Sequence, residues 1–109
     1  MDTDSAVSAF SALAQETRLA TLKLLVKAGP NGVAAGAIAT ELGLAAPTLS
    51  FHLKELERAE LIHARKDGRS IIYAADYGGL RDLIEFLLAD CCGGDKRLCG
   101  PYIIKETCP

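Results

Sequence analysis

Apolar residues recur at intervals of three and four along the first part of this chain, the spacing that places side chains on one face of a helix. Two such stripes occupy residues 5–28, and they comprise Val7, Phe10, Leu13 and Ala14, then Leu19, Leu22, Leu25 and Val26. We therefore expect two helices that divide near residues 15–17, with Thr17 as the cap of the second. The sequence GPNG at 29–32 then breaks the pattern.

The next segment predicts two short helices joined by a tight link. Residues 33–42 have helical spacing and are followed by Gly43, and glycine commonly ends helices. Residues 46–60 make the second helix, because Pro47 falls in its first turn, where a missing N–H is harmless. The apolar stripe of this second helix is Leu49, Leu53 and Leu56. Such a pair of helices is typical of a helix-turn-helix.

A change to β-compatible sequence follows the second helix. Residues 61–65 and 70–74 flank the dipeptide Asp67-Gly68, which predicts a hairpin with a type I′ turn. Helical spacing returns over residues 80–91, with an apolar face of Leu80, Leu83, Ile84, Leu87 and Leu88. A hairpin directly after a helix-turn-helix predicts a mainly α fold with a small β-hairpin wing, a winged helix-turn-helix.

The second helix of the pair carries a polar face with one large apolar residue on it. At 100° per residue, the side chains opposite or beside the leucine stripe are Thr48, Ser50, Phe51, His52 and Lys54. In the major groove of DNA, Phe51 can press on a thymine methyl group while the hydroxyls and Lys54 reach base edges and phosphates. Blander interpretations stay open: Phe51 covers a dimer or domain contact, His52 is a structural residue, and Lys54 is simply solvated.

The hairpin supplies a second basic cluster. Arg65, Lys66 and Arg69 surround its tip, with only Asp67 against them. A wing with three cations at one end can hold the edge of a minor groove or its phosphates, whereas the bland alternative is a solubilising loop. One such domain contacts too little DNA for specificity, so we expect a homodimer on two half-sites of an operator, with the first and last helices as its seam.

Charge and composition narrow the class of protein further. Twelve basic against 14 acidic residues give a net charge of −2, which argues against binding polyanions by bulk charge but allows a local basic face. No apolar run approaches the ~20 residues of a membrane span, and the acidic start MDTDSAVSAF is unlike a secretory signal. We expect a cytoplasmic protein with no membrane partner, divided into a DNA-binding and dimerisation domain (1–92) and an irregular tail (93–109).

In these segments the chain resembles the ArsR/SmtB family of bacterial metal-responsive repressors. The similar stretches are residues 13–25 and 38–74. The specific points of resemblance are Glu16-Thr17-Arg18, Pro47, Ser50-x-His52-Leu53, and Arg65, Gly68, Arg69 and Tyr73 in the wing. The resemblance implies a homodimer that sits on operator DNA and leaves it when an inducer binds.

The resemblance also guides where an inducer would bind. One family pattern places cysteines before the recognition helix, but those positions hold Ala34, Gly36 and Ala39 here. A second pattern puts zinc ligands on the last helix, which has no His in this chain. What remains is the cluster Cys91, Cys92 and Cys99, which resembles the arsenic-sensing members of the family. Trivalent arsenic is soft and prefers thiolate ligands, so these three cysteines are the expected site.

Several functions stay open beside this one. Antimony, or a methylated arsenic species held by Cys91 and Cys92 alone, fits the same cluster, and Cys108 is either a fourth ligand or a free thiol. The same thiols could serve a redox sensor or a divalent-metal sensor. We expect no enzyme, because a small cysteine-dependent reductase would need a catalytic partner beside its thiol and the sequence offers none. A metal carrier and a winged helix for protein contacts are the remaining alternatives, and both predict no binding to DNA.

Overall fold

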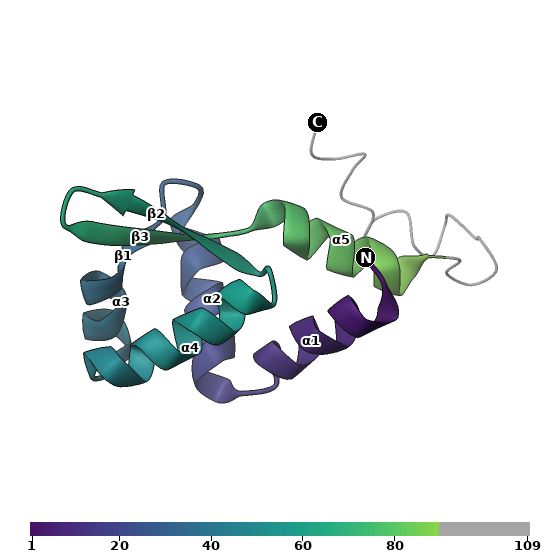
Figure 1. Ribbon diagram of the computed structural model, residues 1–109, viewed down its shortest axis with the longest axis horizontal. Helices are drawn as coiled ribbons and strands as arrows, with labels where there is room; N and C mark the ends of the chain where they lie inside the picture. Colours follow the sequence, from purple (N-terminus) through teal and green to yellow (C-terminus); the bar gives the residue numbers. More distant parts are fainter. Residues whose placement is uncertain (90–109) are drawn as a thin grey trace.

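The computed structural model describes residues 1–89 as a bundle of five helices with a three-stranded sheet on one side (Figure 1). The elements, in chain order, are α1 (Thr3–Leu13), α2 (Glu16–Ala28), β1 (Val33–Ala34), α3 (Ala35–Leu42), α4 (Ala46–Arg58), β2 (Ile62–Asp67), β3 (Ser70–Ala75) and α5 (Tyr77–Leu88). The strands pair antiparallel in the order β1-β3-β2. This arrangement confirms the predicted winged helix-turn-helix, and within residues 1–89 no helix is long and apolar enough to cross a membrane.

Helix α1 turns its small side chains, and not its large ones, toward the core. Its buried residues are Ala6, Ala9 and Ala12. The predicted stripe is therefore not the core face: Val7 is 57% exposed and Phe10 is 42% exposed. Asp2 caps the start of the helix: its carboxylate accepts a hydrogen bond from the Ser5 backbone N–H at 2.8 Å, and this bond lowers the pKa of Asp2.

Helix α2 is capped by Gln15, so the predicted cap at Thr17 was wrong. The Gln15 side-chain oxygen accepts a hydrogen bond from the Arg18 backbone N–H at 2.9 Å, which satisfies one of the free donors of the first turn. Thr17 lies inside the helix, where its carbonyl accepts a hydrogen bond from the hydroxyl of the buried Thr21. Of the second predicted stripe, only the Leu22 and Leu25 pair is buried, whereas Leu19 and Val26 are exposed.

The predicted helix over 33–42 begins two residues late, because Val33 and Ala34 form a short strand. Val33 pairs with Tyr73, and Ala34 pairs with Ile72, which adds a third strand to the expected hairpin. An extended backbone at Ala34 then leads into α3. Gly43 ends α3 in the left-handed conformation (φ 64°, ψ 38°), as its position predicts.

Helix α4 is the second helix of the helix-turn-helix, and its predicted start at residue 46, with Pro47 in the first turn, is confirmed. Its leucine stripe is buried at Leu49, Leu53 and Leu56. The helix ends at Arg58, two residues earlier than expected, because the chain turns at Glu60 with a positive φ of 62°. The buried stripe fixes the rotation of α4 about its axis, and so decides which residues face outward.

The hairpin is confirmed, but its turn lies one residue later than predicted. Asp67 pairs with Ser70, so the two central residues are Gly68 and Arg69, not Asp67 and Gly68. Only Gly68 has a positive φ, as in a type II′ turn with glycine first, whereas the predicted type I′ turn needs a positive φ at both positions.

Helix α5 begins at Tyr77, three residues before the predicted start. Asp76 provides the reason, because its carboxylate accepts the Gly79 backbone N–H at 2.9 Å and caps the first turn. Leu83 is buried in the core, while Leu87 is 56% exposed. The helix ends at Leu88, so the predicted end at residue 91 was too late, whereas the predicted tail 93–109 lies outside the described residues.

Candidate nucleic-acid interface

The outward face of α4 carries the predicted DNA-contacting residues. Thr48, Ser50, Phe51 and Lys54 are all exposed, and Phe51 keeps 58% of its surface open. The Phe51 ring meets the His52 ring edge-on, with centroids 5.5 Å apart. Hydroxyls, an aromatic ring and an ammonium group on one exposed helix face offer hydrogen bonds, apolar contact and charge to a groove of DNA.

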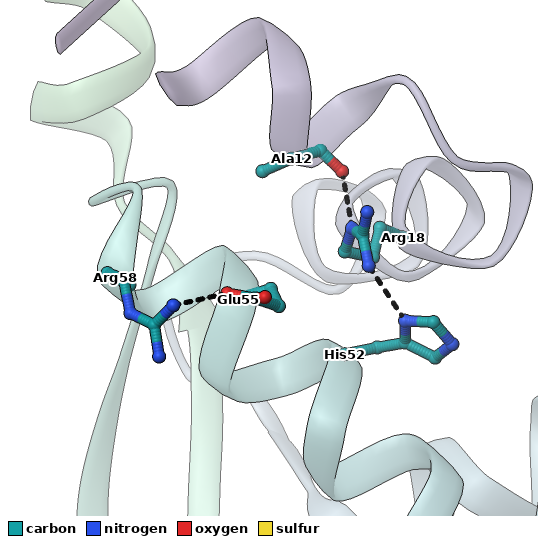
Figure 2. A network of polar contacts seen from close by, with 5 residues as sticks. All are labelled: Ala12, Arg18, His52, Glu55 and Arg58. Carbon is teal, nitrogen blue, oxygen red and sulfur yellow. Dashed lines mark hydrogen bonds and ion pairs between the residues drawn. The ribbon is translucent and has the colours of Figure 1, made fainter.

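His52 is the exception, because its side chain is partly buried and one ring nitrogen is engaged. Its Nδ1 lies 3.2 Å from Nη1 of Arg18, a residue of α2. The same guanidinium donates from Nε to the carbonyl of Ala12 in α1 at 2.7 Å (Figure 2). The spacing of residues in the sequence predicted no role for Arg18, although Glu16-Thr17-Arg18 is one of the points of resemblance to the family.

The cations of the wing are exposed but not equivalent. Arg65 donates from Nη2 to the carbonyl of Asn31 at 2.8 Å, which holds its side chain against the loop before β1. Lys66 and Arg69 make no side-chain hydrogen bond or ion pair within residues 1–89, so both are available to a phosphate. At the base of the wing, partial burial and the nearby Glu57 carboxylate raise the pKa of Tyr73.

The two candidate surfaces lie at one end of the molecule. In Figure 1 the start of α4 and the tip of the β2–β3 hairpin are on the left, whereas α1 and α5 lie side by side on the right. The cations predicted to contact DNA, Lys54 on α4 and Arg65, Lys66 and Arg69 on the wing, belong to these two elements, although the whole chain carries a net charge of −2. None of the residues predicted to contact DNA belongs to α1 or α5.

That other end exposes apolar side chains from two helices. Val7 and Phe10 on α1 and Leu87 on α5 are each more than two-fifths exposed. Scattered apolar residues are normal on a protein surface, but these three stand on two helices that contact each other. The dimer seam that the sequence predicts on these two helices stays a prediction.

The predicted metal ligands Cys91, Cys92 and Cys99 lie outside the described residues. Cys108 lies there too, so all four cysteines of the chain follow the last residue of α5, Leu88. Between residues 1 and 89, no group of three His, Cys, Asp or Glu side chains is placed to hold a metal ion.

A winged helix with an exposed polar recognition helix and a basic wing defines a class, the winged-helix DNA-binding proteins. Comparison with known proteins narrows this class to one family. A helix-turn-helix domain family matches residues 13–65. The chain is 35% identical to the transcriptional repressor SdpR of Bacillus subtilis over 89 residues, which cover 82% of this chain and 96% of that one.

Solved structures agree with this relationship. An ArsR-like transcriptional regulator from Rhodococcus sp. RHA1 superposes with a TM-score of 0.72 at 30% identity, over 96% of this chain and 93% of that one. A homodimeric winged helix-turn-helix DNA-binding domain from Mycobacterium bovis gives a TM-score of 0.66 at 28% identity, over 89% and 84%. The chain belongs to the ArsR family of winged-helix transcriptional regulators.

Proposed function

We propose that this chain is a homodimeric transcriptional repressor that releases operator DNA when trivalent arsenic, or antimony, binds Cys91, Cys92 and Cys99. One observation carries the DNA-binding part: the exposed face of α4 and the free cations of the wing lie at the same end of the molecule. With α4 in a major groove, the wing reaches the adjacent phosphates or minor groove.

The homodimer follows from the reach of one domain. A single recognition helix reads only a few base pairs, so two copies on neighbouring half-sites are needed for specificity. The exposed apolar residues of α1 and α5 offer a second copy an apolar contact away from the α4 face and the wing. The similar domain from Mycobacterium bovis is described as homodimeric, which supports this assembly.

The choice of inducer rests on the sequence and on the chemistry of sulfur. Cys91 and Cys92 follow α5 after two intervening residues, and Cys99 follows seven positions later. Three thiolates suit a soft, three-coordinate ion such as trivalent arsenic, and the nearby Lys96 and Arg97 favour thiolate over thiol. Within residues 1–89 no alternative cluster of metal ligands competes with this one.

The response is a coupling between two separate sites. The three cysteines come directly after a helix of the proposed dimer seam, so ligation there changes the seam and, through it, the spacing of the two recognition helices. A coupling free energy of about 1–3 kcal/mol lowers operator affinity by about 5- to 150-fold, which is sufficient for release. Release therefore requires no competition between inducer and DNA for the same residues.

The test is fluorescence anisotropy on DNA from the gene's own upstream region, titrated with arsenite under reducing conditions. We expect tight binding that is lost at one arsenite per site. Cys91→Ser, Cys92→Ser and Cys99→Ser should each bind DNA normally and ignore arsenite. Cys108→Ser is the matched control, because a three-thiolate site leaves it out.

The outcomes separate the alternatives. Loss of the response in Cys91→Ser and Cys92→Ser but not in Cys99→Ser would replace the three-thiolate site by a two-thiolate one. Tight DNA binding that arsenite leaves unchanged would overturn the arsenic proposal, and a titration with a mild oxidant and with Zn²⁺ would then test the redox and divalent-metal sensors. No binding to any duplex would overturn the repressor itself.

A further inference from the structure

Arg18 connects three helices of the described chain through a single side chain. It stands in the first turn of α2, where the Gln15 cap fixes its backbone. Its Nε donates to the Ala12 carbonyl, near the end of α1, at 2.7 Å. Its Nη1 lies 3.2 Å from Nδ1 of His52 in α4 (Figure 2). The guanidinium is planar, so the bond to Ala12 also orients the donor that faces His52.

This contact determines which nitrogen of His52 carries the proton. A guanidinium has five N–H donors and no acceptor, so the bond can form only if Nδ1 of His52 has a free lone pair. In a neutral imidazole the proton is then on Nε2. Arg18 therefore selects one of the two tautomers of His52, and the other tautomer would set two N–H groups against each other.

The second ring nitrogen of His52, Nε2, is available for a hydrogen bond. Figure 2 shows Nε2 of His52 on the side of the ring that points away from Arg18. Within residues 1–89 this nitrogen makes no hydrogen bond, and it is not buried. Solvent therefore reaches it. His52 precedes Leu53 of the buried stripe and lies beside the exposed Phe51, at the border of the outward face of α4.

We propose that Arg18 makes His52 act toward DNA only as a hydrogen-bond donor. By occupying Nδ1, Arg18 fixes the proton on Nε2. Helix α4 presents this N–H to a hydrogen-bond acceptor on operator DNA. The inference rests on the proposed DNA-binding function and assigns Arg18 as the positioning residue. The acceptor is a phosphate oxygen or an acceptor atom on a base edge, such as guanine N7 or O6, adenine N7 or thymine O4. An amino group of cytosine or adenine at the same place is rejected.

The first experiment reads the tautomer in the free protein, independently of DNA. Long-range ¹H–¹⁵N correlation spectra of the imidazoles distinguish protonated from unprotonated ring nitrogens, and with only two histidines in the chain, His63→Gln assigns the signals. We expect the proton of His52 on Nε2 in the wild type and in Arg18→Lys, since an ammonium also only donates. In Arg18→Met, we expect a mixture of tautomers. A proton on Nδ1 in the wild type would overturn the inference.

The second experiment measures operator affinity by anisotropy in a double-mutant cycle. His52→Asn keeps an acceptor near the Nδ1 position but has no donor at the Nε2 position, whereas His52→Gln keeps a donor there. We expect His52→Asn to weaken binding about two- to tenfold per half-site, the worth of one hydrogen bond in each protomer, and His52→Gln to restore part of the loss. Arg18→Met should weaken binding by a smaller factor, and Arg18→Lys should restore it.

The cycle separates tautomer selection from a purely structural role. If Arg18 acts through Nε2 of His52, Arg18→Met has no further effect in the His52→Asn background. An equal loss in both backgrounds, or a loss that follows the melting temperature alone, would overturn the proposal. Operator variants then identify the acceptor: a base contact loses its His52 dependence when one base pair is changed, whereas a phosphate contact gives the same factor on every duplex. Failure of the wild type to bind DNA would refute the proposed function while the spectra still report the tautomer.

Discussion

The exposed apolar surface of α1 gives a quantitative prediction for the homodimer. Burial of a whole apolar side chain of this kind contributes about 1.5–3 kcal/mol. Phe10 is already partly covered, and 42% of its surface is exposed in the single chain. The newly buried part is therefore worth about 0.6–1.3 kcal/mol in each protomer. A two-fold interface contains the residue twice, so Phe10→Ala costs the dimer about 1.3–2.5 kcal/mol.

That free energy corresponds to a dissociation constant of the dimer raised about ten- to seventyfold. Sedimentation of a dilution series measures this constant directly, without DNA. Ile71→Ala is the matched control, because Ile71 is 46% exposed but stands on β3 of the wing, at the other end of the molecule. A wild-type chain that stays monomeric, or equal effects of Phe10→Ala and Ile71→Ala, would refute the assignment of the seam to α1.

Two further predictions concern the stability of the fold and the part of the wing in DNA binding. Gly79→Ala places a Cβ against the carbonyl of Glu60, so we expect a loss of about 1–3 kcal/mol in the free energy of unfolding. Gly36 lies within α3, and a Cβ there meets no neighbouring atom, so Gly36→Ala should raise the free energy of unfolding by up to about 1 kcal/mol. Chemical denaturation compares the two variants. Arg69→Gln should lower the slope of log affinity against log salt by about 1.8 for the dimer, the share of one phosphate contact from each protomer, while Ser70→Ala leaves it unchanged. Equal slopes for both variants would remove Arg69 from the DNA contact.

Much of this fold could be predicted from local signals. The spacing of leucines over residues 46–60 gave the rotation of α4, and the structure buries all three of them. Gly43 and Pro47 marked the end of one helix and the start of the next, because their backbone preferences act locally and need no partner. The exposed position of Phe51 followed from the same spacing.

Two of the errors arose where a distant partner decides the local structure. Val33 and Ala34 are extended because Tyr73 and Ile72 pair with them, and a strand of two residues has no periodicity of its own. The turn of the wing is likewise set by strand register: the pairing of Asp67 makes it the last residue of β2 and moves the turn forward by one.

The candidate site divides in the same way. Exposure of the α4 face and of the wing cations was predictable, because amphipathic spacing and turn position fix it. The contact between Arg18 and His52 was not, since it joins residues 34 positions apart and depends on how α2 crosses α4. The DNA-contacting roles and the cysteine site stay predictions, and the cysteines lie outside the described residues.

The packing of α4 restricts how the proposed repressor can respond. Its buried leucines fix its rotation, and Arg18 ties its middle to the end of α1. Past its C-terminal end, the backbone of Glu60 lies against Gly79 at the start of α5. A helix held at both places cannot turn alone without breaking a core contact, so α4 moves together with α1 and α5. We therefore expect an inducer bound after α5 to act on the angle between two whole protomers, and we expect the proposed seam, which Phe10→Ala weakens, to transmit the release of DNA.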